Sequence, residues 1–198
     1  MGIIEQIALG AGLSWASGIR LYAALFFAGM LARFGFLDLP SSLGVLTHDW
    51  VLGASGVMLV AEFLADKIPG FDSIWDAIHT FIRIPAGGLL AAGAMGNMDP
   101  AVMAVAGIIG GAIASGSHAT KAGSRALINT SPEPFSNWTA SVAEDIAVPV
   151  GILTAIKLPI VFLVLLVVFL IVAIWLIPKL WRGLRWMFSR LRSSPVTH

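Results

Sequence analysis

The chain contains no cysteine among its 198 residues. Disulfide bonds, thiolate metal sites and cysteine nucleophiles are therefore excluded. Charge is also scarce: Asp, Glu, Lys and Arg make up 12% of the sequence, whereas a soluble domain carries about 25%. The first residues, Met1 to Gln6, lack the basic start and small-residue cleavage site of a signal peptide, so we expect them to belong to the mature protein.

Apolar residues, by contrast, are abundant. They make up 58% of the chain, and the mean hydropathy is +0.89. These values predict an all-α integral membrane protein, because a helix needs about 20 mostly apolar residues to cross about 30 Å of hydrocarbon. We expect about six spans, at Ile7 to Leu31, Trp50 to Ala65, Ile78 to Met95, Ala101 to Ser117, Trp138 to Ile156 and Pro159 to Ile177.

Three short blocks recur in the same order along the chain, which favours an internal duplication. Ala16-Ser17-Gly18 with Arg20 is echoed by Ala114-Ser115-Gly116 with His118, Val60-Ala61-Glu62 by Val142-Ala143-Glu144, and Thr80 to Pro85 by Thr154 to Pro159.

The duplication predicts a first repeat over residues 1–97, a second over 98–178, and a basic amphipathic tail over 179–198. Three spans per repeat is an odd number, so the repeats would enter the membrane in opposite directions. This inverted topology is typical of many transporters.

Basic and aromatic residues alternate in the tail. A helix of this kind suits the headgroup region of an anionic leaflet and favours lipid over nucleic acid as its partner. The positive-inside rule then places the tail in the cytoplasm, and six spans place the N-terminus there too. The basic residues are Lys179, Arg182, Arg185, Arg190 and Arg192.

Small residues in the first and fourth spans have two interpretations. Ser17 and Gly18, with Ser115 and Gly116, could let helix backbones pack closely. Alternatively they could mark helix breaks, which in corresponding positions of two halves indicate a transporter's binding site.

Ionisable residues inside the spans are the candidate substrate- or ion-binding groups, because such residues commonly serve ion pathways and proton relays. They could also form salt bridges, Glu62 with Arg20 and Glu144 with His118 or Lys121. The candidate residues are Glu62, Asp66, Glu144, Asp145, Arg20, His118 and Lys121.

Other charged residues have plainer interpretations. Arg83 and Lys157, each two residues before a proline, fit interfacial snorkelling cations. Asp72 and Asp76 are expected on a solvated face. The histidines follow no metal-ligand spacing, so we predict neither a metal nor a cofactor, and no catalytic residue.

Three long blocks carry a family resemblance. They are AEFLADKIPGFDSIWDAIHTFIRIPAGG from Ala61, GSHATKAGSRALINTSPEP from Gly116, and SVAEDIAVPVG from Ser141. The sequence resembles the bacterial membrane-protein family catalogued as domain of unknown function 4126, up to the basic tail. The resemblance implies a polytopic inner-membrane protein with no established activity.

Three functional hypotheses follow. The first is a small transporter or channel for a cation or a proton-coupled small solute, with a polar site between two inverted repeats and a homodimer as a plausible assembly. The second is a non-catalytic assembly factor or partner subunit. The third is an intramembrane enzyme that holds a lipid phosphate with Arg20, Lys121 and Arg125.

Overall fold

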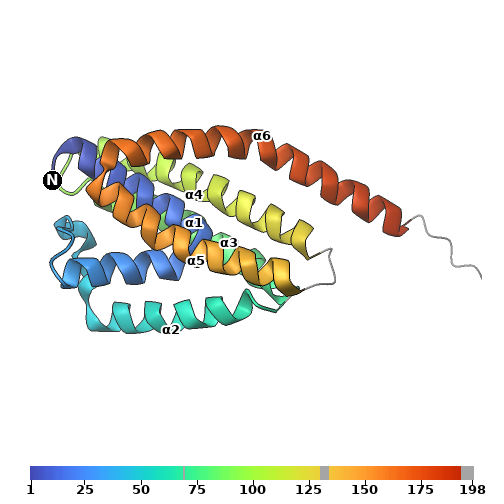
Figure 1. The fold of residues 1–198 in the computed structure, drawn as a ribbon. Coiled ribbons are helices and arrows are strands. Elements are labelled where there is room, and N and C mark those ends of the chain that lie inside the picture. The colour runs from blue at the N-terminus through green and yellow to red at the C-terminus, as the bar shows by residue number, and fades with distance from the viewer. Residues whose placement is uncertain (69, 130–133, 193–198) are drawn as a thin grey trace, which may run out of the picture.

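The computed structural model describes residues 1–68, 70–129 and 134–192, with the backbone alone at 134, 184 and 186–192. The described chain is all-α, as predicted (Figure 1). Its elements are α1 (Ile3–Arg33), the 3₁₀ helix η1 (Ser41–Thr47), α2 (Asp49–Ala65), α3 (Phe71–Ala94), α4 (Pro100–Ile128), α5 (Pro134–Lys157) and α6 (Pro159–Arg192).

Judged by length and composition alone, five of these helices, α1 and α3 to α6, could cross a membrane. The count rises to six if η1 and α2, which meet at 63°, form one bent span. By itself α2 has 17 residues, enough for about 25 Å at 1.5 Å per residue. The chain is therefore a multi-pass membrane protein.

The main difference from the predicted topology is in α1, which folds back on itself. Arg20 has non-helical backbone angles, φ −145° and ψ 89°, and separates an inward arm before it from a returning arm after it. The inward arm runs antiparallel to α3, because Gly10 lies against Ala91 and Ala94 while Ser14 bonds to Gly87 further along.

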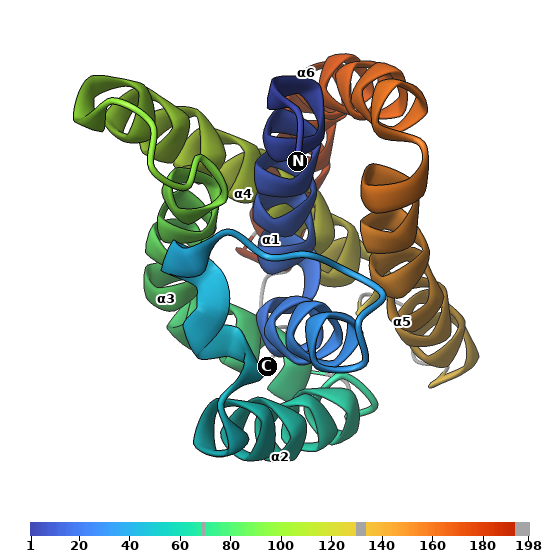
Figure 2. The same cartoon turned by 90° about the vertical axis from the view of Figure 1, so that its left-hand side faces the viewer.

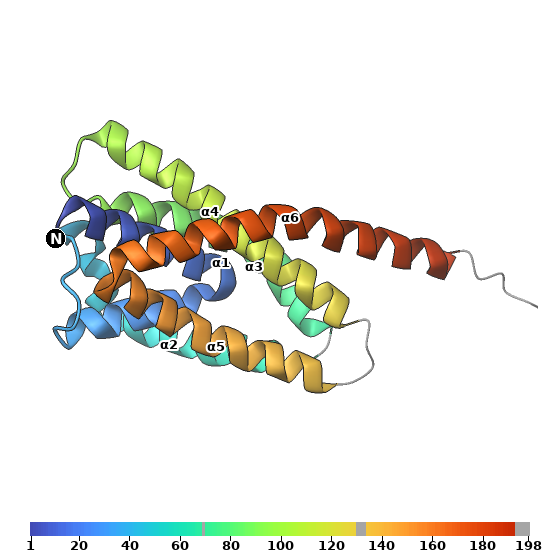
Figure 3. The same ribbon diagram turned by 45° about the horizontal axis from the view of Figure 1, so that its top comes forward.

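The returning arm runs antiparallel to α2. Phe26 lies where a Cβ on Gly56 would point, and Gly29 lies against Leu46 and Leu52 near the start of α2. Since α2 and α3 are themselves antiparallel neighbours, the two arms of α1 form a hairpin that enters and leaves at one end of the bundle, as all three ribbon views show (Figures 1, 2 and 3).

This hairpin changes the predicted placement of the termini. Gln6 and Pro40 both approach Gly96, so the start of α1 and the loop after it share one end of the bundle. The basic end of α6 lies at the opposite end (Figure 3). The predicted topology, in which six spans put both termini on one side, does not fit this arrangement.

The hairpin forms the centre of the bundle. Residues along both arms are buried, and small side chains let the neighbouring helices approach closely. Trp15 packs edge-on against Phe162 and Phe169 of α6, at centroid distances of 6.2 and 6.1 Å. Gly18 meets the Ala114 carbonyl and the Ser117 side chain of α4 so closely that a Cβ would have no room.

The echoed blocks occupy dissimilar places. The backbone leaves helical geometry at Arg20, two residues after Gly18, but α4 is helical through Ser115 and Gly116, so a break there is not observed. Pro85 lies inside α3, whereas its counterpart Pro159 begins α6. The duplication and its two repeats stay a prediction.

The predicted tail is a continuation of α6, which runs through Pro178 to Arg192 without interruption. Lys179 Nζ lies 3.0 Å from the centroid of the Trp175 ring, and the Arg185 guanidinium lies over Trp181 at 5.6 Å. Such pairs suit the boundary between apolar and polar regions. The side chains of Arg190 and Arg192 and all of residues 193–198 lie outside the described part of the chain.

Candidate functional site

Arg20, at the turn of the α1 hairpin, anchors a buried network of charges. Its side chain is fully buried, with Nη2 2.8 Å from Asp66 Oδ2 and Nε 3.1 Å from Asp145 Oδ1. Nη2 also donates to Ser141 Oγ at 2.9 Å. A non-helical backbone inside a membrane protein must be buried in protein or line a hydrated cavity, and these contacts surround the break with polar groups.

Two further bonds hold the backbone next to the break. Lys121 Nζ donates to the Ile19 carbonyl at 3.1 Å, and Ser17 Oγ donates to the Arg83 carbonyl at 2.9 Å. The last carbonyl groups of a helix have no partner within the helix, so Lys121 stabilises the end of the inward arm.

Lys121 and Arg125 extend the network along α4. Lys121 Nζ lies 3.3 Å from Asp66, 3.5 Å from Asp76 and 3.4 Å from Glu144. Arg125 binds both carboxylate oxygens of Glu144, at 3.1 and 3.0 Å. This bidentate geometry is the strong form of the arginine–carboxylate pair.

Arg83 forms the other half of the network. Its guanidinium is fully buried, pairs with Glu62, and lies 2.7 Å from Asp76 Oδ1. The interpretation of Arg83 as an interfacial snorkelling cation is therefore wrong. The predicted bridge from Glu62 to Arg20 is also not formed, because Glu62 pairs with Arg83 instead.

His118 of α4 contacts Arg83 in this half of the network. Arg83 Nη1 lies 3.3 Å from His118 Nδ1, and because arginine only donates, Nδ1 must be the accepting nitrogen. The ring proton then lies on Nε2, 2.6 Å from Thr80 Oγ1, which donates in turn to the Asp76 carbonyl at 2.8 Å.

Asp72 lies at the edge of the network and is buried rather than solvated, as is Asp76. The expected solvated face is therefore not present. Asn129 Nδ2 donates to both oxygens of Asp72, and Asn137 donates to Asn129. Sequence reasoning missed Asn129, Asn137 and Ser141 because uncharged polar residues near a loop are common and carry no signal of their own.

We call the ion-paired residues the charged network. It joins five helices and contains four cations and five carboxylates. Its members are Arg20, Arg83, Lys121 and Arg125, with Glu62, Asp66, Asp76, Glu144 and Asp145.

The network therefore brings together Arg20, Lys121 and the four predicted acids, and His118 joins it through Arg83. Only its α5 edge is open: the side chains of Glu144 and Asp145 are 17% and 25% exposed, against 2% or less for the others.

Several buried polar atoms of the network have no hydrogen-bond partner within the described chain. Unsatisfied buried groups are rare in proteins and indicate water, an ion or a ligand. They include Arg20 Nη1, Glu62 Oε2, Asp66 Oδ1, Asp76 Oδ2, Arg83 Nε and Asp145 Oδ2.

The level of the network along the bundle can be read from the contacts of α4 with α6. Lys121 sits between Gly116 and Gly123 of α4, which face Leu170 and Leu180 of α6. This level corresponds to the last turns of the apolar part of α6, next to its basic extension.

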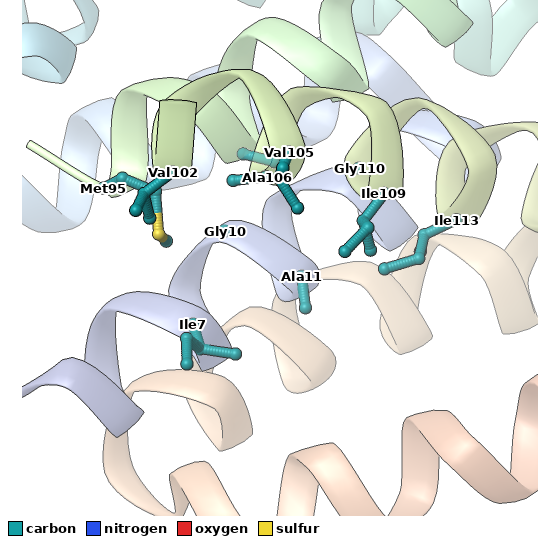
Figure 4. Close-up of a pocket in the computed structure, with 11 residues that line it drawn as sticks. Ile7, Gly10, Ala11, Met95, Val102, Val105, Ala106, Ile109, Gly110 and Ile113 are labelled. Atoms are coloured by element: carbon teal, nitrogen blue, oxygen red, sulfur yellow. The ribbon is translucent and has the colours of Figure 1, made fainter. Parts of the chain in front are cut away.

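The opposite half of the bundle contains an apolar groove. This groove, of about 240 Å³, opens between α1, α3 and α4, with Ile7, Val102 and Ile109 among its lining residues (Figure 4). No group of three or more His, Cys, Asp or Glu side chains that could hold a metal ion occurs among the described residues.

The fold and the site together define a multi-pass helical membrane protein with a charged network around a helix break. The chain belongs to the family described as Domain of unknown function (DUF4126), whose model matches residues 7–179. No curated protein and no solved structure matches the chain.

Proposed function

We propose that this protein is a small membrane transporter for a proton-coupled small solute, and that the charged network is its substrate site. The observation that carries the proposal is the break of α1 at Arg20 inside a buried network with unsatisfied polar atoms. Discontinuous helices that end at buried polar groups form the substrate and ion sites of many transporters.

The composition of the network favours a proton or an organic cation. Carboxylates outnumber the cations, and four of the unsatisfied atoms are carboxylate oxygens. A metal ion is less favoured, since it needs several oxygen ligands at one point and the described residues provide no such group.

The basic extension of α6 supports an orientation and a lipid partner. With Lys179, Arg182 and Arg185 next to an apolar span, the positive-inside rule puts this end in the cytoplasm of a bacterial inner membrane, against anionic headgroups. The charged network then faces the cytoplasmic side, and the open end of the α1 hairpin faces the other side.

The first test of transport uses the purified protein in lipid vesicles that contain a pH-sensitive dye. Each solute of a panel of small organic cations, amino acids and organic acids is given a concentration gradient directed out of the vesicles. We expect the gradient of at least one solute to drive proton movement. Asp66→Asn should abolish this movement, because Asp66 contacts Arg20, Lys121 and Arg125. Proton movement unaffected by this substitution would contradict the proposed site.

One-sided access gives a second prediction, and the absence of native cysteine makes it practical. A cysteine at Asp145 should react with a membrane-impermeant thiol reagent added from the side of the basic α6 extension, and not from the other side. Asn97→Cys, in the exposed turn at the opposite end, is the control and should show the reverse. If Asp145→Cys reacts from neither side, the network has no water-accessible path to either side of the membrane, which would contradict the transporter proposal.

The partner-subunit hypothesis also has an observation in its favour. An apolar groove of about 730 Å³ runs between α3 and α4, lined by Gly88, Gly107 and Gly111 among others. Small residues on an exposed helix face let another helix approach closely. Purification of a stoichiometric partner from native membranes, lost on Gly107→Leu, would favour this function.

The lipid-phosphate enzyme is less supported. Arg20, Lys121 and Arg125, which it would use to hold phosphate, are each paired with carboxylates. A phosphate would have to displace those negative charges.

A further inference from the structure

The charged network lacks one positive charge. Its five carboxylates face four cations, so one negative charge is uncompensated when every group is ionised. Lys67 faces Asp145 from the rim, but it forms no ion pair within 4 Å among the described residues and its ammonium lies over the Phe63 ring. An uncompensated charge in a membrane interior is costly, so a proton or a cation should balance it.

The carboxylates differ sharply in how well they are compensated. Asp66 contacts Arg20, Lys121 and Arg125, and Glu144 contacts the same three cations. Asp145 is paired with Arg20 and is partly exposed to solvent. These three have either several partners or access to water.

Glu62 is the least compensated member. Its single ion pair is with Arg83, and Arg83 is shared with Asp76, which has Lys121 as a second partner. The Glu62 side chain is fully buried, and its second oxygen, Oε2, has no hydrogen-bond partner in the described chain. A proton on Oε2 would remove the surplus charge and leave the bond from Arg83 to Oε1 in place.

We infer that Glu62 is the site at which the charged network binds one proton, and that this is the coupling proton of the proposed transporter. The inference rests on the proposed function only for its second part. The proton comes from a hydronium ion of the solvent: one of its O–H bonds breaks and leaves water, and a new O–H bond forms at Oε2. Arg83 then keeps its hydrogen bond to Glu62 Oε1, but its ion pair is with Asp76 alone, so protonation weakens the attraction between α2 and α3.

The surroundings of Glu62 are consistent with this assignment. Two of the groups around it add negative charge to the site: Asp66, directly after α2, and Asp76 on α3, which shares Arg83 with Glu62. The other groups that face it are Arg20 and Tyr22 on α1, Arg83 on α3 and Lys121 on α4.

Infrared pH-difference spectroscopy of the wild-type protein in lipid vesicles tests the inference without any substitution. A protonated carboxylic acid has a carbonyl-stretch band of its own, distinct from those of a carboxylate. We expect such a band, and we expect it to shift when glutamate side chains carry ¹³C at the carboxyl carbon but not when aspartate side chains do. A band that follows aspartate labelling, or no band at any pH at which the protein is folded, overturns the inference.

Glu62→Gln and Glu144→Gln then separate the two glutamates of the network. The band should vanish in Glu62→Gln and persist in Glu144→Gln; the reverse result overturns the assignment. Because the spectrum reports proton binding and not solute movement, a protein that shows the band but transports nothing would refute the proposed function while leaving the proton site in place.

Discussion

Arg20→Ala is expected to lower the free energy of unfolding by about 3–5 kcal/mol, the usual cost of removing one partner of a buried ion pair. The arginine has no solvent exposure and compensates Asp66 and Asp145 at 2.8 and 3.1 Å. Its loss leaves buried carboxylates with fewer cations at the point where the α1 backbone is not helical. Denaturant unfolding in mixed micelles, followed by tryptophan fluorescence, measures the change.

Arg33→Ala is a matched control on the same helix. Arg33 also pairs with an aspartate, Asp49, but the two side chains are 48% and 78% exposed. Exposed pairs contribute about 0–1 kcal/mol, so this variant should unfold close to the wild type. Equal losses in the two variants would show that burial of Arg20 in the network does not determine its contribution.

The sequence predicts the helical parts of the fold well because the membrane imposes a length and a composition on each span. The predicted spans from Trp50 onward coincide with α2 to α6 apart from their ends. The longer ends of α3 and α4 could not be predicted from hydropathy, because these helices continue into polar sequence such as Asp72 and Arg125, where burial inside the bundle replaces burial in lipid.

The hairpin of α1 could not be predicted from hydropathy. A run of apolar and small residues fits a straight span and a broken one equally, since no proline marks the reversal at Arg20. The stabilising contacts come from Ser141, Lys121 and Asp66, which are distant in sequence. The clue that was available is the arginine itself, which needs buried partners wherever it lies inside the membrane.

In the site, too, part could be predicted from the sequence and part could not. Intramembrane charge selects Glu62, Asp66, Glu144 and Asp145 as candidates, and the structure places them in one network. Their partners depend on which helices are neighbours. Arg83 stands two residues before a proline, which on sequence alone suggests a helix start at the interface, but Pro85 lies inside α3 and places Arg83 in the interior.

Gly18→Ala is expected to destabilise the protein by about 1–3 kcal/mol or more, although alanine is the better helix former by about 1 kcal/mol. A Cβ at Gly18 would collide with the Ser117 side chain and with the Ala114 carbonyl of α4. The serine can rotate, but the carbonyl belongs to a helical backbone and cannot move alone. The inward arm and α4 would have to separate at the level of Arg20, so the charged network should loosen as well.

Gly116→Ala separates this effect from a general loss of glycine. Gly116 is the residue that the sequence echo pairs with Gly18, but a Cβ there would lie 3.8 Å from Leu170, an ordinary contact. Its substitution should leave the free energy of unfolding unchanged or raise it by up to about 1 kcal/mol, from helix propensity. Similar destabilisation of both variants would mean that the two echoed blocks are packed equivalently, as an internal duplication requires; opposite effects would mean that the close approach of α1 to α4 depends on Gly18 alone.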